Sequence, residues 1–149
     1  MKIVFASDHA GLPLKLELKN HLIAKGYEAI DLGTDTPSST DYPLWGKAAA
    51  EVLLRGEADK AVLVCGTGFG ISLAANKHKG VRCVNCSEPY TAAMARRHNN
   101  ANAIALGARV VGVDLAKLIV DTFLDAEFEG ERHSRRVGQL VEIEESNFC

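Results

Sequence analysis

The 149-residue chain has no strong charge of either sign and no long apolar run, and each absence excludes a class of protein. Its 17 basic and 19 acidic residues give a formal net charge of -2, which provides no broad attraction to nucleic acid or to an anionic membrane surface. No segment is long enough to span a bilayer, and the start, MKIVFASDHAG, lacks the apolar stretch of a signal peptide. We therefore expect a cytoplasmic protein with no nucleic-acid or membrane partner.

Cysteine is also scarce, and the spacing of cysteine and histidine gives no metal motif. The four cysteines, at positions 65, 83, 86 and 149, favour reduced thiols over a disulfide scaffold. Cys83 and Cys86 lie within one predicted strand, where residues three apart point to opposite faces, so they cannot share a metal or a disulfide. The histidines, at 9, 21, 78, 98 and 133, show no ligand spacing, and we expect no metal.

The chain does contain alternating short apolar runs and longer amphipathic segments, with no internal repeat or low-complexity stretch. The runs predict strands at 2–7, 27–33, 60–66, 81–86 and 102–107. Helices are predicted at about 12–25, 43–55, 69–78, 88–98, 113–125 and 131–146. The alternation predicts one domain over residues 1–149, an α/β/α sandwich with a five-stranded parallel, doubly wound (Rossmann-like) sheet. The final helix has no strand after it, so it either packs on its own domain or reaches across to a second subunit.

Ligands of such sheets bind beyond the carboxyl ends of the strands, so the loops there should carry the chemistry. The clearest signal is CGTGFGIS at 65–72, a strand that runs into a glycine-rich turn and then a helix. Converging backbone amides and a helix N-terminus suit an anion such as phosphate or an enediolate oxygen. The turn lacks the Gly-Lys-Ser/Thr of a nucleotide P-loop, and taken alone it could equally be strand-to-helix punctuation.

Cys65 favours the functional interpretation of this turn. A lone cysteine is more often a buried apolar residue, but this one ends a strand immediately before a turn rich in N–H donors. A thiol near a helix N-terminus is a competent base or nucleophile near neutral pH because its thiolate is favoured. Asp8 and His9 follow the first strand and would lie beside Cys65 if the first and third strands are neighbours, although Asp8 could instead cap a helix.

Further candidates lie in the second half of the chain. His98 and Asn99 end a predicted helix, where a helix cap is an equally good interpretation. Arg109, Arg132 and Arg136 supply fixed positive charge, and the last two are four residues apart on one predicted helix. That spacing forms a guanidinium fork suited to phosphate, while solvated helix charge is the default interpretation of such a pair.

Taken together, these segments resemble the type B ribose-5-phosphate isomerase family, which also includes galactose-6-phosphate and allose-6-phosphate isomerases. The resemblance runs through SDHAG, TDYP, CGTGFGISLAANK, CSEPYTAAMARRHNNANAIALGARVVG and EGERHSRRV, nearly the whole chain. It implies a metal-free enzyme of carbohydrate metabolism and the pentose phosphate pathway that works as a dimer or tetramer, with active sites at the subunit interface.

The resemblance also implies roles for the residues at matching positions. Cys65 matches the proton-transferring base, and His98 matches the residue that assists opening of the furanose ring. The amides of Gly66, Thr67, Gly68, Phe69 and Gly70 match the cradle for the enediolate. Substrate or phosphate contacts are implied for Asp8, His9, Tyr42, Thr67, Asn99, Arg109, Arg132 and Arg136, and Thr67 is also expected among the catalytic residues. Two alternatives stay open: an isomerase of a six-carbon sugar phosphate, and a non-catalytic phosphate-binding module of the same fold.

Overall fold

The computed structural model describes residues 1–147, so Cys149 lies outside the described residues. Five strands and six helices alternate along the chain, as the sequence predicts. The strands are β1 (Lys2–Ser7), β2 (Glu28–Asp31), β3 (Lys60–Cys65), β4 (Cys83–Asn85) and β5 (Ala103–Gly107). The helices are α1 (Leu12–Ala24), α2 (Tyr42–Leu54), α3 (Phe69–Asn76), α4 (Pro89–Asn99), α5 (Val113–Asp125) and α6 (Arg132–Asn147). None of the helices in residues 1–147 is both long and apolar enough to cross a membrane.

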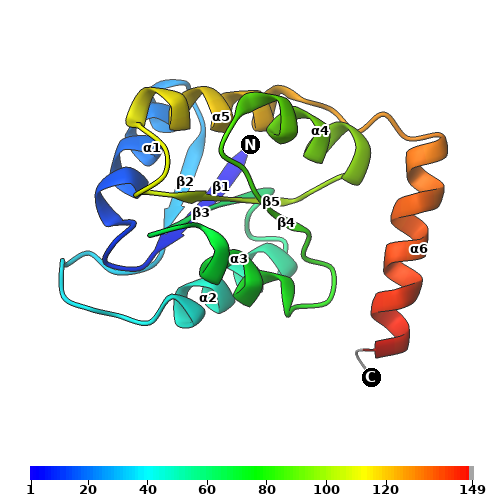
Figure 1. Cartoon of the computed structure of the whole chain (residues 1–149), viewed down its shortest axis with the longest axis horizontal. Helices are drawn as coiled ribbons and strands as arrows, with labels where there is room; N and C mark the ends of the chain where they lie inside the picture. The colour runs from blue at the N-terminus through cyan, green and yellow to red at the C-terminus, as the bar shows by residue number, and fades with distance from the viewer. Residues whose placement is uncertain (148–149) are drawn as a thin grey trace.

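The strands form one parallel sheet with the order β2-β1-β3-β5-β4. Helices α1, α4 and α5 cover one face, and α2 and α3 cover the other (Figure 1). Alternate residues of each strand therefore enter different cores: in β1, Ile3 and Phe5 pack under the first layer, and Val4 and Ala6 under the second. Burial on both faces explains why the strands are continuous apolar runs. The three-layer, doubly wound sandwich is confirmed.

The same alternation separates Cys83 from Cys86. Cys83 belongs to the core beneath α2 and α3, whereas Cys86, just after β4, belongs to the core beneath α1, α4 and α5. Burial raises the pKa of the Cys83 thiol far above its ordinary value, and it also raises that of Cys86. The prediction that the two cysteines point to opposite faces of the sheet is confirmed, and both thiols are core residues.

Helix α6 stands apart from the sandwich at one end of the molecule (Figure 1). Its contacts with the domain are few: Glu144 accepts a hydrogen bond from the Gly80 N–H at 2.9 Å, and His133 is its one buried residue among those described. The apolar side chains of Leu140 and Ile143 are 47% and 59% exposed. The helix therefore packs on its own domain only in part, and it leaves apolar side chains exposed.

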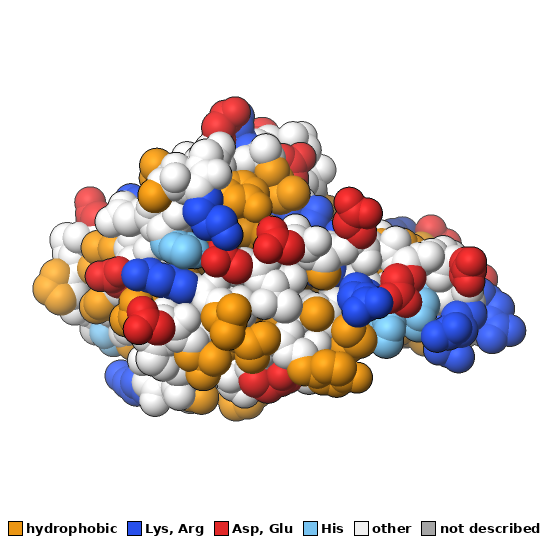
Figure 2. All heavy atoms as spheres, turned by 90° about the horizontal axis from the view of Figure 1, so that it is seen from above, with side chains coloured by type: hydrophobic (Ala, Val, Ile, Leu, Met, Phe, Trp, Pro, Cys, Tyr) orange, Lys and Arg blue, Asp and Glu red, His pale blue; other side chains and the backbone are white. Residues whose placement is uncertain are grey.

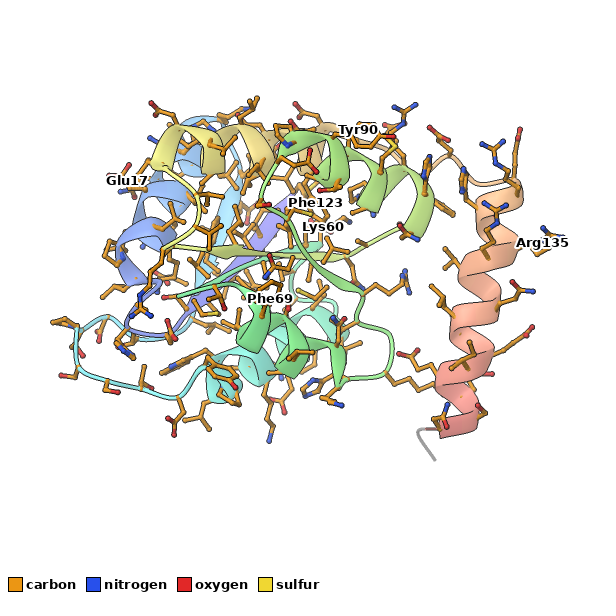
Figure 3. The ribbon with its side chains drawn as sticks, viewed as in Figure 1. Glu17, Lys60, Phe69, Tyr90, Phe123 and Arg135 are labelled. Carbon is orange, nitrogen blue, oxygen red and sulfur yellow. The ribbon has the colours of Figure 1, made fainter. Side chains whose placement is uncertain are left out.

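Basic side chains lie with histidine at this projecting end of the molecule (Figure 2). The first turns of α6 carry Arg132, Arg135 and Arg136. Arg135 points away from the domain (Figure 3). Positive charge is thus concentrated at the N-terminal end of α6, whereas the C-terminal half of the same helix carries Glu142, Glu144 and Glu145.

Candidate active site

The sheet order reverses at β1 and β3, and a cavity of about 220 Å³ opens where these two strands end. A reversal of this kind separates the loops that follow the two strands, and such crevices are the usual ligand sites of parallel sheets. The cavity is lined by Asp8, His9, Ala10, Tyr42, Cys65, Gly66, Thr67, Gly70 and Arg109. Eight of the predicted site residues are therefore brought together, and the expected neighbourhood of Asp8, His9 and Cys65 is confirmed.

Cys65 is the last residue of β3 and is only 4% exposed, yet it reaches the cavity. Its Sγ accepts a hydrogen bond from the Gly68 N–H at 3.1 Å, and helix α3 begins one residue later. A hydrogen bond from an amide and the positive end of a helix both favour negative charge on sulfur. The turn therefore holds the sulfur of Cys65 at the cavity, where its hydrogen-bond donor is one residue from the start of α3.

Close contacts favour glycine at positions 68 and 70 of the turn most strongly. Gly68 has a φ of 82°, and a Cβ there would come within 2.4 Å of the side-chain nitrogen of Asn85. A Cβ on Gly70 would lie 2.7 Å from the ring of Tyr42, and one on Gly66 would lie 3.0 Å from the guanidinium of Arg109. The turn thus places its backbone directly against Tyr42 and Arg109, which form the sides of the cavity.

His9 has a fixed orientation because its ring accepts a hydrogen bond from the backbone. The backbone N–H of Thr40 donates to Nδ1 of His9 at 3.1 Å. A backbone amide can only donate, so Nδ1 must be unprotonated, and the proton of the neutral ring is on Nε2. Asp8 accepts a hydrogen bond from the Gly11 N–H at 3.0 Å through Oδ1, which closes the loop after β1 rather than capping α1.

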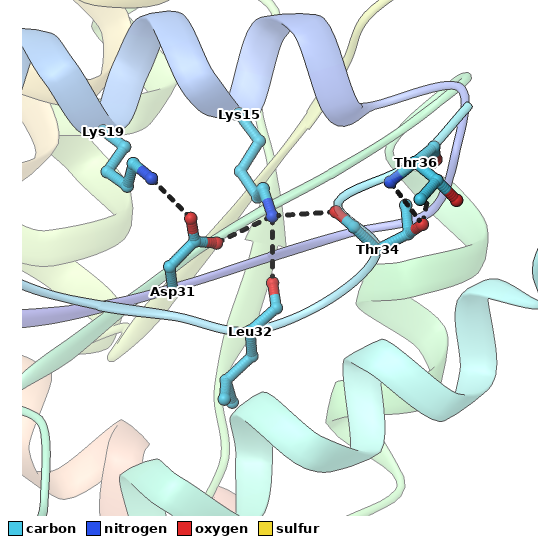
Figure 4. Close-up of polar contacts among 6 residues, drawn as sticks. All are labelled: Lys15, Lys19, Asp31, Leu32, Thr34 and Thr36. Carbon is cyan, nitrogen blue, oxygen red and sulfur yellow. Dashed lines mark hydrogen bonds and ion pairs between the residues drawn. The ribbon is translucent and has the colours of Figure 1, made fainter. Parts of the chain in front are cut away.

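The loop that carries Thr40 is anchored by a buried lysine (Figure 4). Lys15 of α1 is 1% exposed, and its Nζ donates to Asp31 at 2.7 Å and to the carbonyls of Leu32 and Thr34 at 3.2 Å each. Burial would raise the pKa of Asp31, but the hydrogen bonds from Lys15 and Lys19 outweigh it and hold that pKa below its ordinary value. This anchor fixes the start of an irregular loop whose far end positions His9.

A second group of predicted residues lies around α4 and the start of α6. The rings of His98 and His133 stack with centroids 4.2 Å apart and planes 8° from parallel. Glu129, in the α5–α6 connection, lies at the edge of both rings and accepts a hydrogen bond from Arg97 at 2.6 Å. Burial, followed by the charges of His98 and Arg132, lowers the pKa of His133, and the bond from Arg97 lowers that of Glu129.

Within residues 1–147, the cavity lining does not include His98, Asn99, Arg132 or Arg136. Asn99 is the last residue of α4, and the helix is capped by Asn100, which has a φ of 47°. The cap expected at His98 or Asn99 is therefore formed by Asn100. The structure thus divides the predicted site into two groups: the cavity group at the β1–β3 reversal, and the α4–α6 group. The cavity group also adjoins Gly68 and Phe69, which sit in the turn without lining the cavity.

Several residues that shape these groups carry no sequence signal. Thr40 acts through its backbone amide, which any residue except proline provides. Lys15 has the periodicity of an ordinary helix residue, and its burial follows only from the packing of the loop after β2. Glu129 and His133 are four residues apart but lie outside one helix, and His98 comes from another element. The separation in sequence hid this cluster from the search for metal-ligand spacing.

Fold and site define an enzyme of small, anionic ligands, with a thiol, an imidazole and a guanidinium around a glycine-rich turn at a sheet reversal. A family model described as Ribose/Galactose Isomerase matches residues 3–140. The chain is 50% identical over 144 residues to ribose-5-phosphate isomerase B of Escherichia coli, with 97% of each chain covered. It therefore belongs to the ribose/galactose isomerase family.

Solved structures agree with this assignment over nearly the whole chain. Ribose-5-phosphate isomerase B of Clostridium thermocellum superposes with a TM-score of 0.97 at 53% identity, covering 98% of this chain and 99% of the other. The Mycoplasma genitalium enzyme, solved with bound ribulose-5-phosphate, superposes with a TM-score of 0.93 at 40% identity, covering 98% and 97%. The resemblance inferred from the motifs is confirmed.

Proposed function

We propose that the protein interconverts ribose 5-phosphate and ribulose 5-phosphate through an enediolate, as a cytoplasmic enzyme of the pentose phosphate pathway. The observation that carries this proposal is the Cys65 thiol at the cavity, hydrogen-bonded to Gly68 at the start of α3. A base held beside converging amides is what aldose-ketose isomerisation needs, because a proton moves while an oxygen beside it becomes negative. The relatives named ribose-5-phosphate isomerase B support this choice of reaction.

In the proposed mechanism, the Cys65 thiolate removes the proton from C2 of the open-chain aldose and returns it to C1. The proton on O2 must leave and O1 must gain one, so a neighbouring group shuttles a proton between the two oxygens; Thr67 lines the cavity and offers a hydroxyl for this role. The amides of Thr67 and Gly70 are assigned to the enediolate oxygen, since the amide of Gly68 already serves Cys65. One well-placed donor of this kind contributes about 3 kcal/mol.

Ring opening and phosphate binding are assigned to the α4–α6 group, with His98 as acid-base and Arg132 and Arg136 as the phosphate fork. These residues do not line the cavity of their own chain within the described residues, so the proposal requires a second copy to supply them. Apolar surface near the cavity supports such a dimer: Phe69 and Leu73, one turn apart on α3, are both 63% exposed. Two identical shared sites per dimer follow from twofold symmetry.

The test is turnover of ribose 5-phosphate by purified protein, followed by the appearance of ribulose 5-phosphate. Allose 6-phosphate and galactose 6-phosphate should be compared in the same assay, because the family description covers ribose and galactose isomerases. A higher kcat/KM for a six-carbon substrate would refute the proposed specificity while leaving the reaction class intact. Full activity of an isolated monomer would refute the shared site.

A further inference from the structure

One peptide unit, which joins Thr67 to Gly68, connects Cys65 to a residue that does not line the cavity. The N–H of this unit belongs to the buried Gly68 and donates to Sγ of Cys65 at 3.1 Å. Its carbonyl belongs to Thr67 and accepts a hydrogen bond from Nδ2 of Asn85 at 3.2 Å. Since the C=O and N–H of a trans peptide point in opposite directions, Asn85 and Cys65 bind the two ends of one plane.

Asn85 reaches this turn from β4, the strand at the edge of the sheet, of which it is the last residue. Cys83, two residues earlier, packs beneath α2 and α3, so the alternation of the strand directs Asn85 to the same face, where α3 begins. A carbonyl oxygen can only accept a hydrogen bond, so the group that faces Thr67 must be the NH₂ of Asn85. The orientation of the side-chain amide is therefore defined.

The backbone at Gly68 does not fix the plane of this peptide by itself. Glycine adopts positive and negative φ about equally readily, so rotation of the peptide before Gly68 meets little intrinsic resistance. On one side the peptide is confined by β5, because a Cβ on Gly107 would lie 2.7 Å from the carbonyl carbon and oxygen of Thr67. The hydrogen bond from Asn85 supplies a directional restraint that glycine lacks.

We propose that Asn85 is a positioning residue for Cys65: its hydrogen bond to the Thr67 carbonyl keeps the Gly68 N–H directed at the sulfur and makes it a stronger donor. A donor on the carbonyl polarises the peptide, and hydrogen bonds in series strengthen one another by about 10–30% per bond. A stronger donor favours the negative form of sulfur over the neutral form. The part of Asn85 in the reaction rests on the proposed function, in which Cys65 is the base.

Two variants remove the donor in different ways. Asn85→Val has no polar atom and suits a strand, whereas Asn85→Asp keeps the shape of the side chain but turns a carboxylate oxygen toward the Thr67 carbonyl. The side chain is half-buried, so both variants should fold, which circular dichroism checks. The matched control is Asn20→Asp, the same chemical change at an exposed position of α1, on the other face of the sheet. Loss of folding in both Asn85 variants would show a purely structural role and overturn the proposal.

The first measurement needs no sugar phosphate. The rate of alkylation of Cys65 by iodoacetamide is recorded against pH, and the modified peptide is quantified by mass spectrometry. In Asn85→Val the midpoint of this profile should move to higher pH by about 0.3–1 pH unit, the equivalent of one neutral hydrogen bond whose place water can partly take. Asn85→Asp should move it further, because its carboxylate disfavours a second negative charge nearby. Asn20→Asp should match the parent, and equal midpoints in all four proteins would overturn the proposal.

The other groups that can influence this midpoint are unchanged among the four proteins. Those that line the cavity with Cys65 come from the loop after β1, from α2 and from the loop after β5: Asp8, His9, Tyr42 and Arg109. A difference between the midpoints of the parent and an Asn85 variant therefore reports the substitution itself.

The second measurement separates positioning from structural damage and from the proposed function. With ribose 5-phosphate, Asn85→Val should lower kcat by about 2–12-fold with KM nearly unchanged, and the loss should shrink as pH rises and the thiol ionises in both proteins. A loss of kcat that is equal at every pH would indicate structural damage, and a raised KM alone would indicate a substrate contact; either result would overturn the proposal. A parent that shows the expected alkylation profile but no turnover would refute the proposed function, while the control of the sulfur by Asn85 would stand.

Discussion

Replacement of Cys65 separates the chemistry of the site from its stability. In Cys65→Ala, the Gly68 amide loses its hydrogen-bond partner at a buried position, which should cost about 1–3 kcal/mol of the free energy of unfolding. Cys65→Ser keeps an acceptor on the same carbon and should recover part of that loss. Neither variant has a thiolate, so both should lose proton transfer by a factor of about 10²–10⁴.

The assay is incorporation of solvent deuterium next to the carbonyl of the sugar phosphate in heavy water, with chemical unfolding measured on the same samples. The expected result is a graded loss of stability, larger for alanine than for serine, with a nearly equal loss of exchange in both variants. Exchange at the parental rate in folded Cys65→Ala would refute the role of the thiol and direct the search to Asp8 or His9.

Three further predictions concern other parts of the site and its support. Arg136→Ala, and equally Arg132→Ala, should leave the thermal midpoint of unfolding nearly unchanged, since both arginines lie on a projecting helix. Inhibition by free phosphate should weaken by about tenfold or more in either variant. Equal phosphate inhibition of variant and parent would contradict the phosphate fork. His98→Ala should slow turnover of the cyclic sugar and spare deuterium exchange into an open-chain substrate, which can be measured side by side. The lowered pKa of Asp31 in the folded state means that its contribution to stability is present above the unfolded pKa of about 3.9 and is lost as pH falls through the folded value. Asp31→Asn should therefore flatten the acid limb of a plot of unfolding free energy against pH. An unchanged limb would show that the ion pair of Asp31 with Lys15 does not contribute to the pH dependence of stability.

Much of the fold could be predicted because its signals are local. Each strand is an apolar run because helices cover both faces of the sheet. The sequence left it open whether the first and third strands are neighbours, and the structure shows that they are. Cys65 and its turn were found for the same reason, since strand, glycines and helix start are contiguous in the sequence. The strand at 27–33 proved shorter, ending at Asp31, because Lys15 binds the carbonyls of Leu32 and Thr34, which turn toward it at the strand's end.

The contacts that hold the site residues in place could not be predicted from the sequence. They join segments that are distant in the chain, and some of them use backbone atoms, which every residue has. His9 is held by the backbone amide of a residue 31 positions away in the sequence. Glu129, in the connection before α6, lies beside the ring of His98 on α4, and no sequence pattern links these two residues. The division of the site also has no sequence signature. Arg132 and Arg136 lie four residues apart on one helix, as predicted, but only the packing of α6 shows that these residues do not line the described cavity of their own chain.

In the proposed shared site, the separation of α6 from the cavity of its own chain links ligand binding and subunit association in a single equilibrium. A sugar phosphate that contacts Cys65 of one chain and the arginines of another is a bridge between chains. By thermodynamic reciprocity, whatever factor the dimer adds to the affinity for substrate, substrate must add to the affinity between subunits. Bound substrate would then stabilise the dimer. At a high concentration of pentose phosphate, the protein would stay dimeric at protein concentrations where the ligand-free chains dissociate.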